Sequence, residues 1–215
     1  NVTVKRCFYA YEYAEQFVKG KIAADIGCGT GYGTVHLAQF ADKITGVDYS
    51  EVTLNQSRID YAEVKNMDFV VGKVPPVPLD SESVDVVTSF QFIEHIHERP
   101  QFIQDVFRVL KPGGVFICTT PNAKMSLARN PFHVHEYTFD EILKEFKKTF
   151  KNVELMGLQG NETVNAYYRE NAKWVRKILK WDIFGIHKIL PSSWVAWPYN
   201  FLTTLMRRDL MEKVD

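Results

Sequence analysis

The sequence has few cysteines and no pattern that would organise them. Its 215 residues contain three, Cys7, Cys28 and Cys118, and no C-x-x-C pair. An odd, scattered set of thiols argues against a disulfide framework and against a zinc knuckle built from paired cysteines. We therefore expect the protein to work in a reducing, cytoplasmic environment.

The sequence also lacks an excess of charge and any long apolar run. Twenty-six basic residues balance twenty-six acidic ones, so the formal net charge at pH 7 is +0. This balance gives no reason to expect nucleic acid as a partner. No apolar run approaches the roughly 18 to 20 residues of a membrane span, and no signal-peptide pattern opens the chain. The 46% of hydrophobic residues can form the core of one large domain.

Short apolar runs alternate with helix-like segments between residues 20 and 160. We expect strands at 21–27, 43–48, 67–72, 84–90 and 115–120. We expect helices at 33–41, 51–64 and 99–114, the last ending at a Pro-Gly-Gly stop. Strands that alternate with helices predict a parallel sheet with right-handed crossovers, which is a doubly wound α/β fold.

The expected helix at 51–64 has a clear start signal. Ser50 stands directly before it and is a plausible N-cap. We expect its Val52, Ile59 and Ala62 to face the core. The proline-rich stretch 73–83 predicts a loop, because neither a helix nor a central strand tolerates so many prolines.

Four glycines alternate with other residues directly after the first expected strand: Gly27, Gly29, Gly31 and Gly33. Glycine loses more backbone freedom on folding than any other residue, so this density needs a reason. In a doubly wound sheet the ligand crevice lies at the carboxyl ends of the strands, where this loop falls. We interpret the glycines as room for a small molecule to approach main-chain N–H groups, rather than as a tight turn alone.

The spacing of the glycines excludes two familiar ligands. A G-x-G-x-x-G fingerprint for a dinucleotide fails in both registers, because its third glycine falls on Tyr32 or on Thr34. No G-K-[ST] follows, which excludes a P-loop. Asp25 precedes the glycines, and a carboxylate there would repel a pyrophosphate and suit a cationic ligand group.

This D-x-G-x-G-x-G pattern resembles that of the class I S-adenosylmethionine-dependent methyltransferases. Asp48, in "GVDYS" at the end of the second expected strand, is placed to accept both ribose hydroxyls. The segments "RVLKPGG", "TTPN" and "SFQFIEHIHE" are similar to further motifs of the family. The resemblance implies S-adenosylmethionine as cofactor. It implies a binding set of Asp25, Gly27, Cys28, Gly29, Gly31, Asp48, Tyr49, Lys73, Val74 and Phe90.

One residue departs from the family pattern. Members commonly carry an acidic residue after the third strand that holds the adenine amino group, and here Lys73 stands in its place. Because lysine cannot accept a hydrogen bond, we expect adenine to be contacted through the backbone of Val74, with Lys73 pointing to solvent, or cofactor binding to be weaker.

More narrowly, "IEHI" and "NPFHVHEYTFDE" are similar to methyltransferases found with glycosyltransferases in surface-polysaccharide biosynthesis. This implies methyl transfer by in-line displacement to a small-molecule or glycan acceptor. A hydroxyl acceptor needs a base, and His95, His133 and His135 are the candidates, each with a purely structural role as the alternative. Transfer to nitrogen or to a carboxylate, and a noncatalytic S-adenosylmethionine-binding regulatory module, remain open.

A metal site is the less favoured interpretation of the same histidines. His133, His135 and Glu136 are ligand types. However, Mg²⁺ prefers carboxylate oxygens, and the spacing identifies no further ligand. We therefore expect no metal.

The last quarter of the chain differs in composition. It holds all four tryptophans, Trp174, Trp181, Trp194 and Trp197, among basic residues. We expect a methyltransferase domain at 1–160 and a helical extension at 161–215. The extension would pack as a lid, form the seam of a homodimer, or contact an anionic membrane surface peripherally.

Overall fold

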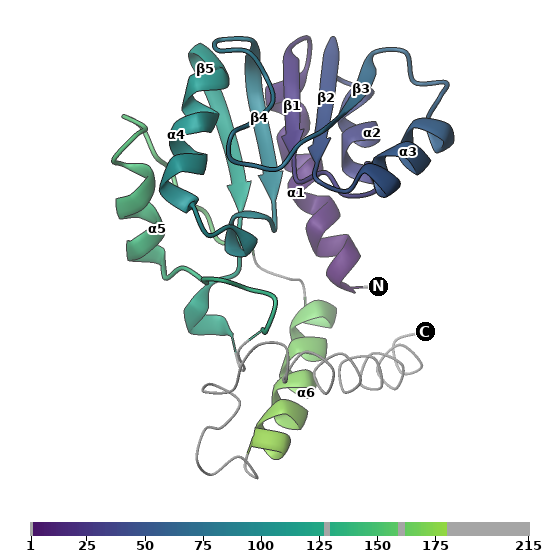
Figure 1. Cartoon of the computed structure of the whole chain (residues 1–215). Helices are drawn as coiled ribbons and strands as arrows, with labels where there is room; N and C mark the ends of the chain where they lie inside the picture. The colour runs from purple at the N-terminus through teal and green to yellow at the C-terminus, as the bar shows by residue number, and fades with distance from the viewer. Residues whose placement is uncertain (1, 127–129, 159–161, 180–215) are drawn as a thin grey trace.

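The computed structural model describes residues 2–126, 130–158 and 162–179 and contains one five-stranded sheet. Its strands are β1 (Ile22–Ile26), β2 (Lys43–Asp48), β3 (Met67–Val71), β4 (Val84–Phe90) and β5 (Leu110–Thr119). They lie in the order β3-β2-β1-β4-β5, and every neighbouring pair is parallel (Figure 1). The predicted doubly wound α/β fold is confirmed. The strand order reverses between β1 and β4, so the ligand crevice of such a sheet lies at their carboxyl ends.

The helices are α1 (Val2–Val18), α2 (Tyr32–Ala38), α3 (Glu51–Asp60), α4 (Arg99–Val109), α5 (Phe139–Phe146) and α6 (Glu162–Leu179). Two short 3₁₀ helices, η1 (Ile93–His95) and η2 (Ala123–Met125), follow β4 and β5. Neither α1 nor α5 was expected from the sequence. For α5 a signal was present, because Thr138 and Glu141 form a capping box at its start.

The two faces of the sheet carry separate apolar cores. Side chains alternate along β1, so Ala24 and Ile26 pack with the residues of α4, while Ala23 packs with those of α1 and α2. Phe102 of α4 is fully buried and lies edge-on to Phe92, in the loop after β4. Each face therefore rests on helices, as an all-parallel sheet requires.

The inward face of α3 differs from the predicted one. Ser50 caps the helix as expected, because its side chain accepts a hydrogen bond from the Thr53 N–H. However, Val52 and Ile59 are 83% and 70% exposed, and Ala62 is exposed as well. Leu54 is buried instead, against Cys28 and Phe69, together with the small residue Ser57. The prediction was wrong because a single leucine and a serine, rather than the more numerous apolar residues, fit against the glycine loop.

The segment after α4 also differs from expectation. The helix ends at Val109, and Leu110 adopts an extended conformation that leads directly into β5. The expected Pro-Gly-Gly stop therefore lies inside the strand, where the pairing register shifts between Val84 and Val86. A bulge accommodates the extra residues, and Gly113 takes a φ of 81° there.

Of the four tryptophans in the last quarter of the chain, one lies among the described residues. Trp174 falls within α6, which Figure 1 shows beyond the carboxyl edge of the sheet. Trp181, Trp194 and Trp197 lie outside the described residues. Among the described helices, none is both long and apolar enough to cross a membrane. The boundary at residue 160 stays a prediction.

Candidate active site

The glycine loop joins β1 to α2 at the carboxyl edge of the sheet. Gly27, Gly29 and Gly31 have φ values of 78°, 54° and 74°, which side-chain-bearing residues rarely adopt. A Cβ would lie 2.4 Å from Phe92 Cδ2 at Gly27 and 2.6 Å from Phe69 Cζ at Gly31.

The remaining two glycines of the loop differ in the space around their Cα atoms. A Cβ at Gly33 would lie 1.9 Å from Tyr11 Cζ. At Gly29 it would meet nothing within 4 Å. Packing therefore requires glycine at three of the four positions, and only Gly29 turns its Cα toward open space. This is the position where a ligand can approach the main chain.

Several N–H groups of the loop have partners within the chain. Gly27 and Cys28 both donate to the Val47 carbonyl, at 2.8 and 3.1 Å. Gly29 donates to Asp48 Oδ2 at 3.0 Å. These three amides fasten the loop to the end of β2, so in this structure they donate within the chain. Burial raises the pKa of the Cys28 thiol, which keeps it neutral.

Asp25 supports the loop from inside the protein. Its side chain is 1% exposed and accepts hydrogen bonds from Thr34 and Thr88 at 2.8 Å and from Tyr11 Oη at 3.3 Å. Burial raises its pKa to about 6, although the three hydroxyl groups act in the opposite direction. Asp25 therefore braces β1 against α1, α2 and β4, and its carboxylate is enclosed within the protein.

Asp48 is the acidic group that remains accessible at this edge. It ends β2, and its Oδ1 accepts the N–H of Ser50 at 3.0 Å while Oδ2 accepts that of Gly29. A carboxylate has about four lone-pair sites, so two acceptor positions remain for ligand hydroxyls. With the open face of Gly29 beside it, Asp48 fits the ribose of the expected cofactor.

The other predicted cofactor residues differ in how exposed they are. Tyr49 is 75% exposed directly beyond Asp48. Lys73 is exposed, as expected, and Val74 is half-buried against the core. The Phe90 side chain is buried and lies edge-on to Tyr11, with ring centroids 4.7 Å apart. Phe90 can therefore contribute its backbone to the crevice but not the body of its side chain.

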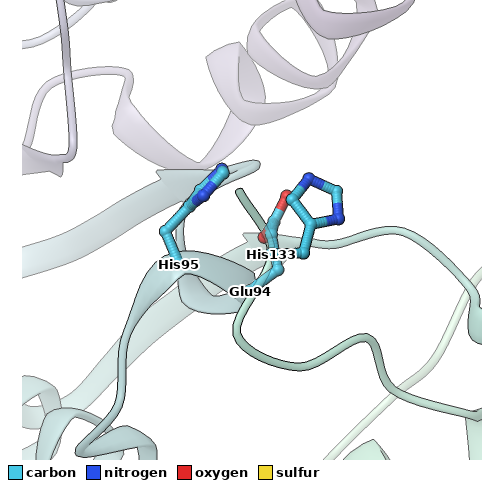
Figure 2. A group of neighbouring side chains, drawn as sticks. All are labelled: Glu94, His95 and His133. Atoms are coloured by element: carbon cyan, nitrogen blue, oxygen red, sulfur yellow. The ribbon is translucent and has the colours of Figure 1, made fainter. Parts of the chain in front are cut away.

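Three titratable side chains meet beside the same edge, as Figure 2 shows for Glu94, His95 and His133. Glu94 and His95 belong to η1, whereas His133 comes from the loop that follows β5. One ligand-type atom from each lies within 4.8 Å of the others, and the two imidazole rings meet edge-on with centroids 4.9 Å apart.

Main-chain and hydroxyl contacts hold this group together. The Glu94 carbonyl accepts the N–H groups of Val134 and His135 at 2.7 and 3.2 Å, which docks the loop onto η1. The Glu94 side chain is 1% exposed and accepts a hydrogen bond from Thr120 at 3.1 Å. Burial raises the pKa of Glu94 above its ordinary value, while the nearby histidines lower it.

The structure separates the two histidines of the H-x-H segment. His133 Nδ1 lies 2.5 Å from Glu136 Oε1, whereas His135 packs edge-on against Tyr137 at 4.7 Å. The set considered from sequence, His133, His135 and Glu136, is therefore replaced by one that includes Glu94. Sequence reasoning missed Glu94, because a buried glutamate beside a histidine has no distinguishing spacing.

Residues 24–118, from within β1 to within β5, match the methyltransferase domain family. A Mycolicibacterium smegmatis protein named as a probable S-adenosylmethionine-dependent methyltransferase is 34% identical over 173 residues, covering 78% of this chain and 63% of the relative. A ubiquinone biosynthesis O-methyltransferase of Coxiella burnetii is 28% identical over 137 residues, covering 62% and 58%. The chain thus spans less than two thirds of these relatives.

Solved structures agree on the fold. A crystal structure of an S-adenosylmethionine-dependent methyltransferase from Mesorhizobium loti superposes with a TM-score of 0.60 at 17% identity, covering 69% of this chain and 82% of that one. S-adenosylmethionine is the cofactor that the matched domain implies. Residues 24–118 therefore match the methyltransferase domain family in sequence, and the sheet has the fold of solved S-adenosylmethionine-dependent methyltransferases.

Proposed function

We propose that this protein transfers a methyl group from S-adenosylmethionine to a hydroxyl oxygen of a small-molecule or glycan acceptor. The observation that carries the proposal is the pairing of Asp48 with Gly29, whose Cα faces open space at the carboxyl edge. When bound there, S-adenosylmethionine supplies a methyl group on a positively charged sulfur, which is already activated for transfer.

The chain's own residues have separable tasks in this proposal. Asp48 would accept the ribose hydroxyls, Tyr49 would line the adenine side, and the Val74 backbone would contact adenine in place of the acidic residue missing at Lys73. Because the donor is activated, most of the catalytic effect would come from aligning the acceptor with the methyl group.

The preference for oxygen rests on the group formed by Glu94, His95 and His133. An acceptor hydroxyl must lose its proton, and this group lies at the edge where an acceptor would meet the cofactor. His135 is less suited, because its ring packs against Tyr137. The name of the Coxiella burnetii relative, an O-methyltransferase, supports the same preference.

Calorimetry with S-adenosylmethionine tests the cofactor site. Asp48→Ala should lower the affinity by at least roughly ten-fold, which corresponds to about 1.4 kcal/mol. Asp60→Asn is the matched control, since Asp60 is exposed at the end of α3 and contacts Gln56. Equal affinity in wild type and Asp48→Ala would contradict the proposed site.

Transfer of radiolabelled methyl groups tests the reaction. Nucleotide sugars and lipid-linked glycans would be compared with amine- and carboxylate-bearing acceptors. Label in a base-stable ether on a hydroxyl supports the proposal. Label on nitrogen or in a carboxyl ester would contradict the oxygen preference, and cofactor binding with no transfer to any acceptor would favour the noncatalytic alternative. The glycan acceptor, a homodimer and membrane contact through 161–215 are proposals of the same kind.

A further inference from the structure

We propose that Glu94, His95 and His133 form a binding site for one divalent transition-metal ion. The three side chains come from η1 and from the loop after β5, and they converge on one another in Figure 2. Their ligand-type atoms lie within 4.8 Å of one another. Ligands of a tetrahedral ion, each about 2.0 to 2.1 Å from the metal, lie roughly 3.4 Å apart. Binding would therefore require the side chains to rotate toward one another.

Each histidine is oriented by a partner on its Nδ1 atom. His95 Nδ1 lies 2.8 Å from the carbonyl oxygen of Phe132. A carbonyl can only accept, so Nδ1 carries a proton, and in the neutral ring the lone pair is on Nε2. His133 Nδ1 lies 2.5 Å from the Glu136 carboxylate, which fixes the same tautomer. Such carbonyl and carboxylate partners are the usual supports of metal-binding histidines.

The remaining polar contacts are compatible with an ion. Glu94 Oε2 accepts a hydrogen bond from Thr120 at 3.1 Å, and Oε1 is left for coordination. The Asn130 side-chain nitrogen lies 2.8 Å from His133 Nε2. An amide nitrogen donates, so this contact also requires a lone pair on Nε2, and a metal ion would displace the amide.

The ligand types indicate which ions the site would accept. Two imidazoles and one carboxylate suit Zn²⁺, Co²⁺ or Fe²⁺, whereas Mg²⁺ and Ca²⁺ prefer sites made of oxygen ligands. Three protein ligands leave a coordination position open. This step alone rests on the proposed function. If that function holds, the acceptor hydroxyl would bind at the open position, and the metal ion would lower the pKa of the hydroxyl.

The experiment measures binding of Zn²⁺ and Co²⁺ alone to the untagged full chain after removal of metals with a chelator. Calorimetry should give one Zn²⁺ per chain, and Co²⁺ should produce visible absorption bands that Zn²⁺ abolishes. His95→Gln, His133→Gln and Glu94→Gln should each weaken binding by roughly ten-fold or more. His97→Gln is the matched control, because His97 is exposed two residues beyond His95.

The outcomes distinguish this inference from the proposed function. Circular dichroism identifies a variant that fails to fold. Should buried Glu94→Gln be such a case, the exposed His95→Gln still decides the question. Absence of stoichiometric binding, or binding that His95→Gln retains and His97→Gln loses, overturns the metal site. S-adenosylmethionine affinity is measured separately, so intact cofactor binding without metal refutes only the inference, and metal binding without cofactor affinity refutes only the proposed function.

Discussion

Adding one methyl group at two different glycines of the loop should have two different effects. At one glycine it should mainly lower the free energy of unfolding, and at the other it should mainly weaken cofactor binding. A Cβ at Gly33 would lie 1.9 Å from the Tyr11 ring, which is 4% exposed. The ring cannot swing away easily, because it lies edge-on to Phe90 and its hydroxyl donates to Asp25. Overpacking costs about 1 to 3 kcal/mol. Weakening a hydrogen bond to a charged group costs about 1.5 to 3 kcal/mol more.

We therefore expect Gly33→Ala to lower the free energy of unfolding by about 3 kcal/mol or more. Gly29→Ala meets no atom within 4 Å, so its cost is only that of holding alanine at a φ of 54°. A left-handed conformation costs about 1 to 2 kcal/mol. The new methyl group would occupy the open face beside Asp48, and we expect S-adenosylmethionine affinity to fall by roughly ten-fold, or about 1.4 kcal/mol.

Gly20→Ala provides the control. Gly20 has a φ of 67°, and a methyl group there would meet nothing within 4 Å, but it precedes β1 at the opposite edge of the sheet. It should share the stability cost of Gly29→Ala and keep wild-type affinity. Urea unfolding and calorimetry measure the two quantities. Two results would refute these expectations: Gly29→Ala binding as well as Gly20→Ala, or Gly33→Ala proving as stable as either.

Three further variants test the supports of the site. Asp25 has a folded-state pKa of about 6 against an ordinary value of 3.8, so its contribution to the free energy of unfolding falls by about 3 kcal/mol as pH rises from about 4 to 6. Urea unfolding of Asp25→Asn across this range should lack that decline, and an unchanged pH profile would contradict the assignment. Thr138→Ala should cost about 1 kcal/mol by removing the α5 capping box, which urea unfolding against Thr138→Ser would measure. Phe102→Ala should cost about 3 to 5 kcal/mol, seen as a lower urea midpoint, because the side chain is fully buried.

The sheet could be predicted from the sequence because its signal is local. All five expected strands are present, since each is a short apolar run bounded by turn residues. Asp48 and Ser50 could also be placed, because a strand end and a helix cap depend on neighbours a few residues away. The inward face of α3 could not, because tertiary contact with the glycine loop decided it.

In the candidate site, too, the residue types could be predicted from the sequence but their grouping in space could not. The histidines were recognised as chemistry-bearing residues, but their grouping depends on contacts across the fold. Nothing in the spacing of residues 94 and 133 indicates that the carbonyl of Glu94 docks the loop carrying His133. For the same reason the glycines could be counted but not assigned. Which of them packs against a ring and which opens to a ligand is decided by Tyr11, Phe69 and Phe92.

Phe92 links the two halves of the site. Its ring fills the space that a Cβ at Gly27 would need, and it lies edge-on to Phe102 in the core with centroids 5.6 Å apart. Phe92 is also the N-cap residue of η1, and Glu94 follows two residues later. A larger residue at Gly27 would therefore displace Phe92, and with it Glu94 and His95 of η1, as well as the glycine loop. The glycine at position 27 thus leaves room for the residue that precedes η1 as well as for the turn between β1 and α2.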